Sequence, residues 1–133
     1  MIWTVLNGET RVTVTMIEAV DRVDSGAIWE RRHFHVEDHE LSDEMNEKLF
    51  EVELELMEYA ICNTGNIVPT MQNESNASYY RRRTPEDSRL DPMRSIAEQF
   101  DLLRVCDNTR YPAFFEYRGH RYELRLTKVG RSK

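Results

Sequence analysis

Asp24 is the side chain whose sequence setting most favours chemistry. It lies in Val23–Ile28, where Ser25 and Gly26 follow it before apolar residues return. A carboxylate on a tight glycine-containing turn between apolar strands is held in place, and a fixed carboxylate can take a proton from a reacting group. The structural alternative is a turn residue that accepts backbone hydrogen bonds. The turn therefore allows both a catalytic and a structural Asp24.

A second group of residues with chemical potential is Tyr79–Arg83, two tyrosines followed by three arginines. Guanidinium groups bind phosphate through paired hydrogen bonds, and a neighbouring aromatic ring can stack on a base. Charge is unevenly distributed: residues 1–79 hold 5 Lys or Arg against 16 Asp or Glu, whereas residues 80–133 hold 13 against 8. The basic half either meets phosphates or forms a solvated face that complements the acidic half.

Four segments together resemble a known family. Asn7-Gly8-Glu9, Val14-Thr15 and Val23–Ile28, with Tyr80–Ser88 far downstream, resemble the formyltransferases that take a one-carbon unit from 10-formyltetrahydrofolate. Further segments resemble elements of the members that act on nucleotide-linked amino sugars: Leu103-Arg104-Val105, Tyr111–Phe115 and Gly119. The resemblance covers about residues 3–129.

The resemblance implies formyl transfer from 10-formyltetrahydrofolate to the amine of a nucleotide-linked amino sugar. It makes Asp24 the catalytic carboxylate. The cofactor's pteridine ring would lie against a turn made of Val20, Asp21, Arg22, Val23 and Asp24. The substrate would lie against Tyr80, Arg81 and Arg82.

The sequence also departs from the family pattern. Thr13 and Arg22 stand where the family usually has glycine, and Arg22 could crowd the turn or pair with Asp24. The Asn and His that steady the oxyanion in the family precede the region of Trp3. We therefore expect a C-terminal portion of such an enzyme, inactive or barely active alone, because removing oxyanion donors costs orders of magnitude in rate.

Two alternatives stay open. A methionyl-tRNA formyltransferase-like protein shares the catalytic signature, but that enzyme usually continues into a basic tRNA-binding domain. Here only residues 93–133 follow the connection and the net charge is −6, so we do not expect a nucleic-acid partner. The other alternative is a non-enzymatic interaction or assembly module with exposed strand edges, which predicts a homo-oligomer or a complex with an N-terminal partner subunit.

Composition excludes several other classes. With 133 residues the chain can form one modest core, and it has neither 18 consecutive apolar residues nor a secretory signal, which predicts a cytoplasmic protein away from membranes. Cys62 and Cys106 lie in apolar stretches, so we expect buried, reduced thiols. His33, His35 and His39, with Asp38 and Asp43, lack a strong ligand spacing, and no metal site is predicted.

The elements expected to position these residues follow from hydrophobic periodicity. Residues 2–6 and 12–18 predict strands of a hairpin about Asn7-Gly8, and residues 27–36 predict a further strand. Residues 42–63 predict an amphipathic helix with Ser42 as its N-cap. An irregular connection over 64–92, a helix over 94–106 and a hairpin over 113–129 complete the prediction.

These elements predict an α/β class that is α+β within this chain. An incomplete Rossmann-like sheet of formyltransferase type would carry the long helix, and a small helix and hairpin would follow. We expect the catalytic part over 1–66, a linker over 67–92 and a C-terminal subdomain over 93–133.

Overall fold

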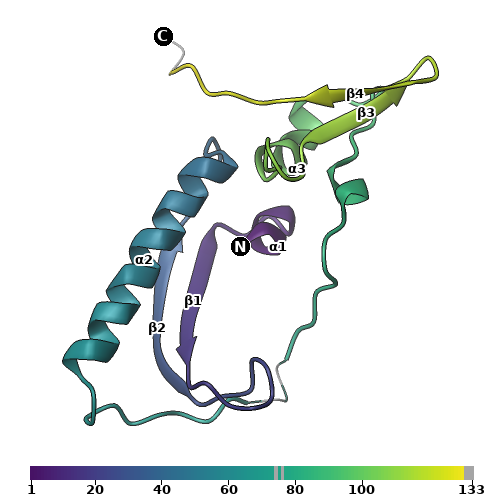
Figure 1. Cartoon of the computed structure of the whole chain (residues 1–133). Helices are drawn as coiled ribbons and strands as arrows, with labels where there is room; N and C mark the ends of the chain where they lie inside the picture. Colours follow the sequence, from purple (N-terminus) through teal and green to yellow (C-terminus); the bar gives the residue numbers. More distant parts are fainter. Residues whose placement is uncertain (74, 76, 131–133) are drawn as a thin grey trace.

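The computed structural model describes residues 1–73, 75 and 77–130. Its elements are α1 (Ile2–Leu6), β1 (Arg11–Ile17), β2 (Ile28–His35), α2 (Ser42–Cys62), 3-10 turns at Pro85–Ser88 and Ala97–Gln99, α3 (Phe100–Arg104), β3 (Ala113–Tyr117) and β4 (His120–Leu124). The strands form two antiparallel pairs, β1 with β2 and β3 with β4 (Figure 1). The predicted mixed α and β class is confirmed.

The predicted N-terminal hairpin is wrong, because residues 2–6 form helix α1. The Gly8 N–H donates to Val5 O at 2.9 Å and the Glu9 N–H to Thr4 O at 3.0 Å. This is the Schellman pattern that ends helices, with a left-handed glycine just beyond the last turn, and Gly8 has φ +76°. Asn-Gly therefore ends a helix here instead of joining two strands.

Strand β1 pairs with β2, the segment predicted over 27–36. Val12 lies opposite Phe34, and both side chains are buried against α2. Thr13 lies opposite His33 on the other, exposed face, where Thr13 Oγ1 and His33 Nδ1 are 2.9 Å apart. The register shifts between Met16 and Ile17, so the pairing becomes irregular just before the turn that carries Asp24.

Helix α2 confirms the prediction over 42–63 and buries Met45, Val52 and Leu56. Its N-cap is Leu41, not Ser42. The Glu44 carboxylate accepts the Leu41 N–H at 2.9 Å, while the Ser42 hydroxyl donates to Cys106 O at 3.0 Å. Ser42 therefore links the start of α2 to the segment after α3, and Glu44 caps the helix in its place.

The cysteines differ from each other. Cys106 is buried, as predicted, in a cluster with Leu90, Leu103 and Ala113. Cys62 is exposed, which contradicts the prediction, because it lies on the last turn of α2 beyond the residues that contact the sheet.

The predicted helix over 94–106 forms only from Ala97, first as a 3-10 turn and then as α3. Ser95 and Glu98 exchange hydrogen bonds, with Ser95 N–H to Glu98 Oε2 at 2.9 Å and Glu98 N–H to Ser95 Oγ at 3.2 Å. This reciprocal capping fixes the start of the helix after Ser95.

The end of α3 connects the two hydrophobic clusters. Val105 is buried among the residues of β1, β2 and α2, and the Arg104 guanidinium donates to Glu37 O at 2.9 Å. The division into 1–66, 67–92 and 93–133 remains a prediction. Within the described residues, no helix is long and apolar enough to cross a membrane.

Candidate functional site

Asp24 lies on the ten-residue connection between β1 and β2, and its side chain is exposed. Its backbone is left-handed, with φ 59°, a conformation that Asp tolerates better than most residues. The Ser25 hydroxyl donates to Arg22 O at 2.8 Å and tightens the turn. A Cβ on Gly26 would lie 1.8 Å from Glu18 O, so only glycine lets the two arms of the connection approach this closely.

The linker holds this turn from outside. The Gln72 side-chain amide donates to Asp24 O at 2.8 Å and to Gly26 O at 2.7 Å. Two backbone hydrogen bonds between Ile28 and Thr70, at 2.7 and 2.9 Å, extend the contact. Asp24 therefore sits on a turn with a fixed backbone while its carboxylate faces solvent. Nothing in the sequence indicated Gln72, a polar residue in a polar segment.

The remaining turn residues leave both backbone and apolar groups accessible. Val20 and Val23 are 48% and 82% exposed. Among the described residues, the backbone N–H groups of Val20, Asp21, Val23 and Asp24 donate no hydrogen bond. Arg22 does have an interaction of its own. A flat heterocycle with hydrogen-bonding edges fits such a surface, since backbone groups can pair with its edge and valines can contact its face.

Tyr80 lies against α1. Its ring stacks on Trp3 with centroids 5.4 Å apart and planes inclined by 13°, and Asn7 Nδ2 donates to its hydroxyl at 2.9 Å. The structure thereby joins the Asn7-Gly8-Glu9 motif to the Tyr80–Ser88 motif, 73 residues away. Trp3 was absent from the predicted site; an aromatic residue four positions before Asn7 is the one signal the sequence offered.

The two arginines after Tyr80 differ in availability. Arg81 pairs with the Asp87 carboxylate and lies 5.6 Å from the Trp3 ring centre. The Arg81 side chain, followed by the Thr84 N–H, lowers the pKa of Asp87 below its usual range. The Arg82 guanidinium makes no hydrogen bond or ion pair with the described residues. Arg82 is thus available to a ligand, whereas Arg81 is held within the linker.

The predicted residues form two groups, the Asp24 turn and the Tyr80–Arg82 segment. No hydrogen bond or ion pair within the described ranges joins Asp24 to Tyr80, Arg81 or Arg82. The sequence around His33, His35 and His39 did not predict a metal site. In the described part of the chain, no group of three His, Cys, Asp or Glu side chains is placed to bind a metal ion.

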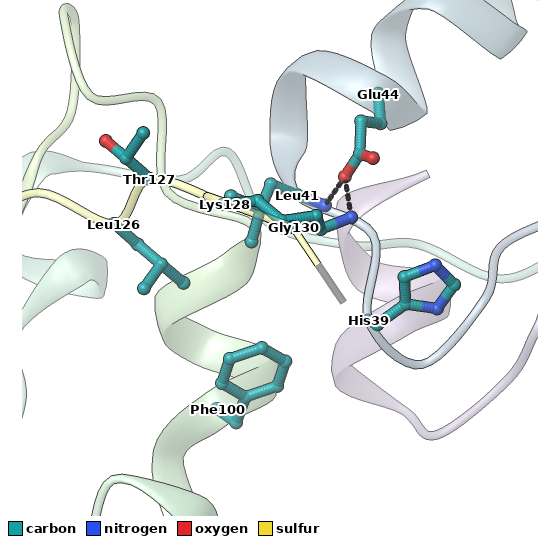
Figure 2. A pocket seen from close by; sticks show the side chains of 8 residues that line it. All are labelled: His39, Leu41, Glu44, Phe100, Leu126, Thr127, Lys128 and Gly130. Atoms are coloured by element: carbon teal, nitrogen blue, oxygen red, sulfur yellow. Dashed lines mark hydrogen bonds and ion pairs between the residues drawn. The ribbon is translucent and has the colours of Figure 1, made fainter. Parts of the chain in front are cut away.

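A pocket lies elsewhere, between the start of α2, α3 and the C-terminal segment (Figure 2). It has a volume of about 750 Å³ and a floor of Leu41, Phe100 and Leu126. Lys128 lies at one side of the pocket and pairs with Glu44. The Lys128 ammonium and then the Leu41 N–H, which both donate to the Glu44 carboxylate, lower its pKa below the usual value. No residue of the Asp24 turn lines this pocket, so we place the candidate site at the turn, where the carboxylate is, and not in this pocket.

Solved structures place this chain in a fold class. The methionyl-tRNA formyltransferase from Clostridium thermocellum matches 99% of this chain and 57% of its own length, at 22% identity and a TM-score of 0.78. A sugar N-formyltransferase from a Shewanella species matches 98% and 55%, at 16% identity and a TM-score of 0.75. HypX from Aquifex aeolicus in complex with tetrahydrofolic acid matches 94% and 22%, at 22% identity and a TM-score of 0.70.

The chain therefore has the formyltransferase fold, as the sequence resemblance implied. It spans little more than half the length of the first two structures. No protein-family model matches the sequence.

Proposed function

We propose that this chain forms the Asp24-bearing part of a formyltransferase that transfers a formyl group from 10-formyltetrahydrofolate to the amine of a nucleotide-linked amino sugar. The observation that supports this most is an exposed carboxylate on a turn clamped by Gln72, inside a formyltransferase fold. The first part of this observation concerns the position of one side chain, and the second concerns the fold of the whole chain.

Asp24 supplies the proton acceptor in this proposal. An amine that becomes an amide loses a proton, and the carboxylate takes it as the nitrogen bonds to the formyl carbon. When bound, 10-formyltetrahydrofolate would supply the formyl carbon; the bond from that carbon to the cofactor nitrogen would break, and tetrahydrofolate would leave with a proton on that nitrogen. The carbonyl oxygen becomes an oxyanion that needs hydrogen-bond donors, which the resemblance assigns to an Asn and a His outside residues 1–133. The proposal therefore includes a segment outside residues 1–133, on the same or another polypeptide, that carries these donors.

The turn residues provide the cofactor surface. Val20, Asp21, Val23 and Asp24 offer backbone N–H groups that donate no hydrogen bond within the described residues, the two valines are exposed, and Arg22 completes the turn. Binding through backbone groups explains how Arg22 can replace a glycine, because the side chain at that position need not face the ring. The tetrahydrofolate-bound HypX structure shares the fold, which supports a folate-type cofactor.

Tyr80, Arg81 and Arg82 provide the substrate surface. Arg82 would contact a phosphate directly, since it has no partner within the described residues. Arg81 would instead hold the linker in place through Asp87. Tyr80 already stacks on Trp3, so a base could extend the same stack.

Methionyl-tRNA is the second candidate acceptor. It is favoured by the likeness to the Clostridium thermocellum enzyme, whose TM-score of 0.78 is as high as that to the sugar enzyme. The fold therefore does not choose between the two amines. An assay that offers both acceptors separates the candidates directly.

Two measurements test the proposal. The first is tetrahydrofolate binding to the full chain by isothermal titration calorimetry, with and without Val23→Asp. The second is formyl transfer from 10-formyltetrahydrofolate to a nucleotide-linked 4-amino sugar or methionyl-tRNA, with a polypeptide that supplies the remaining part of the fold. We expect binding that Val23→Asp weakens, and transfer that Asp24→Asn reduces at least a hundredfold while binding is kept. No binding by the chain and no transfer in the mixture would overturn the proposal.

A further inference from the structure

Helix α2 has a second apolar face besides the one that covers the sheet. Phe50, Leu54, Met57 and Ile61 follow each other at intervals of four, three and four residues, so they form one stripe, the outer stripe. Their exposed fractions are 60%, 48%, 54% and 76%. The buried residues Met45, Val52 and Leu56 lie on a different side of the same helix. Because α2 runs along the outside of the β1–β2 pair (Figure 1), the outer stripe faces away from the core.

An acidic row borders the outer stripe. Glu47 stands three positions before Phe50, and Glu58 stands four after Leu54 and three before Ile61, so both are its neighbours on the helix surface. Glu51 extends the row between them. None of these three carboxylates forms an ion pair within the described residues. Lys48, the basic residue of α2, is already paired with Glu40.

We propose that the outer stripe is a docking site for a partner protein whose segment presents apolar side chains flanked by Lys or Arg. An apolar row bordered by unpaired carboxylates is complementary to a basic amphipathic helix, which would cover the stripe and neutralise the row. This inference is independent of the proposed function.

The same charges disfavour the other occupants. Two copies that pack stripe to stripe in an antiparallel pair bring the acidic row of one against that of the other, which is repulsive. An anionic lipid surface is repelled for the same reason. A basic protein segment is therefore the occupant that both the apolar and the charged side chains favour.

The probe is a synthetic helical peptide with a leucine stripe and flanking lysines, added to the full chain and followed by fluorescence anisotropy. A peptide of the same composition in scrambled order is the reference. We expect the patterned peptide to bind at least roughly tenfold more tightly than the scrambled one. The difference should shrink when salt is raised from about 0.05 M to about 0.5 M, because the charged contribution is screened.

Variants locate the binding to the outer stripe. Leu54→Lys with Met57→Lys should weaken binding at least roughly tenfold, since it places cations where apolar contact is expected. Glu58→Lys should weaken it more than Glu55→Lys does. Glu55 changes the same charge on the same helix and neighbours Glu51 and Glu58, but it lies three or four positions from no stripe residue. Both single substitutions are at exposed positions, and circular dichroism melts should confirm that the fold is kept.

Three outcomes would overturn the proposal. One is equal binding of patterned and scrambled peptides. Another is equal weakening by Glu55→Lys and Glu58→Lys, which would mean general charge attraction only. The third is a dimer in sedimentation velocity that Leu54→Lys with Met57→Lys dissociates, since the stripe would then be covered by a second copy.

Discussion

The two antiparallel pairs are joined in different ways. Strands β3 and β4 meet through Arg118 and Gly119 alone, with φ of 51° and 80°, the two left-handed residues of a tight hairpin turn. Strands β1 and β2 are joined by ten residues, and only Asp24 among the non-glycine residues of that connection is left-handed. The β3–β4 connection has only the residues needed to reverse the chain. The β1–β2 connection is longer than chain reversal requires.

The difference indicates that the β1–β2 connection has a role besides joining two paired strands. The longer connection uses Gly26, Ser25 and Gln72 to fix its shape, although a shorter one would close the strands with fewer constraints. Fixing a loop costs conformational entropy, about 1–2 kcal/mol per residue. An expensive fixed loop that exposes a carboxylate is typical of a binding or catalytic site.

The largest effect should come from the short hairpin. Phe114 is fully buried on β3, beneath the Arg121 guanidinium. Phe114→Ala should lower the free energy of unfolding by about 3–5 kcal/mol through lost contacts and a cavity. Urea unfolding measures the loss. Tyr117→Ala, at an exposed position of the same strand, should cost less than about 1 kcal/mol. Equal losses would mean that β3 is not packed as described.

Gly26→Ala should damage the long connection next. The added Cβ meets the Glu18 carbonyl, a backbone atom that cannot rotate away. We expect a loss of about 3 kcal/mol, at the upper end for overpacking, with tetrahydrofolate affinity falling roughly tenfold because the turn shifts. Gly119→Ala is the control: it meets no atom within 4 Å but keeps a positive φ, which costs about 1–2 kcal/mol. If it changes tetrahydrofolate affinity as much, the two connections do not differ in role.

Sequence periodicity was sufficient where a long pattern was present. The 21 residues of α2 and the tight β3–β4 turn follow rules that local sequence obeys. It failed for residues 2–6, where a β-branched composition favours strand but only five residues are involved. Packing of Val5 into the core and the Schellman cap together outweigh that weak preference.

The candidate site was predictable only in part. The Asp24 turn and Tyr80–Ser88 could be proposed from motifs, whereas the contacts that hold them could not. Gln72 is 48 residues from Asp24, and Asn7 is 73 residues from Tyr80. Periodicity describes one element at a time, so pairs this far apart become visible only after the chain folds.

Gln72→Ala tests the clamp on the long connection with a smaller expected effect. The variant loses two hydrogen bonds, to Asp24 O and Gly26 O, which together contribute about 1–2 kcal/mol. We expect weaker tetrahydrofolate binding and faster hydrogen exchange of the Glu18, Ser25 and Ile28 N–H groups, which donate hydrogen bonds in or beside the turn. Met71→Ala, one position earlier and 78% exposed, should change neither. Unchanged exchange in Gln72→Ala would show that the turn holds its shape without the linker.

The smallest effect concerns the contact between α3 and the loop that precedes α2. Glu40 is buried there beside the main-chain contacts of Arg104. Burial alone would raise its pKa, but the Lys48 ammonium and the Glu37 N–H outweigh it and hold the pKa below the usual value. Since the folded pKa is lowered, Glu40 stabilises the fold above the unfolded pKa of about 4.3 and loses this contribution as pH falls through the folded value. Glu40→Gln should therefore cost about 1 kcal/mol at pH about 7 and less at pH about 3. Scanning calorimetry at both values measures this, with the fully exposed Asp38→Asn as the control. A loss that stays the same at both pH values would mean that the Glu40 charge does not stabilise this contact.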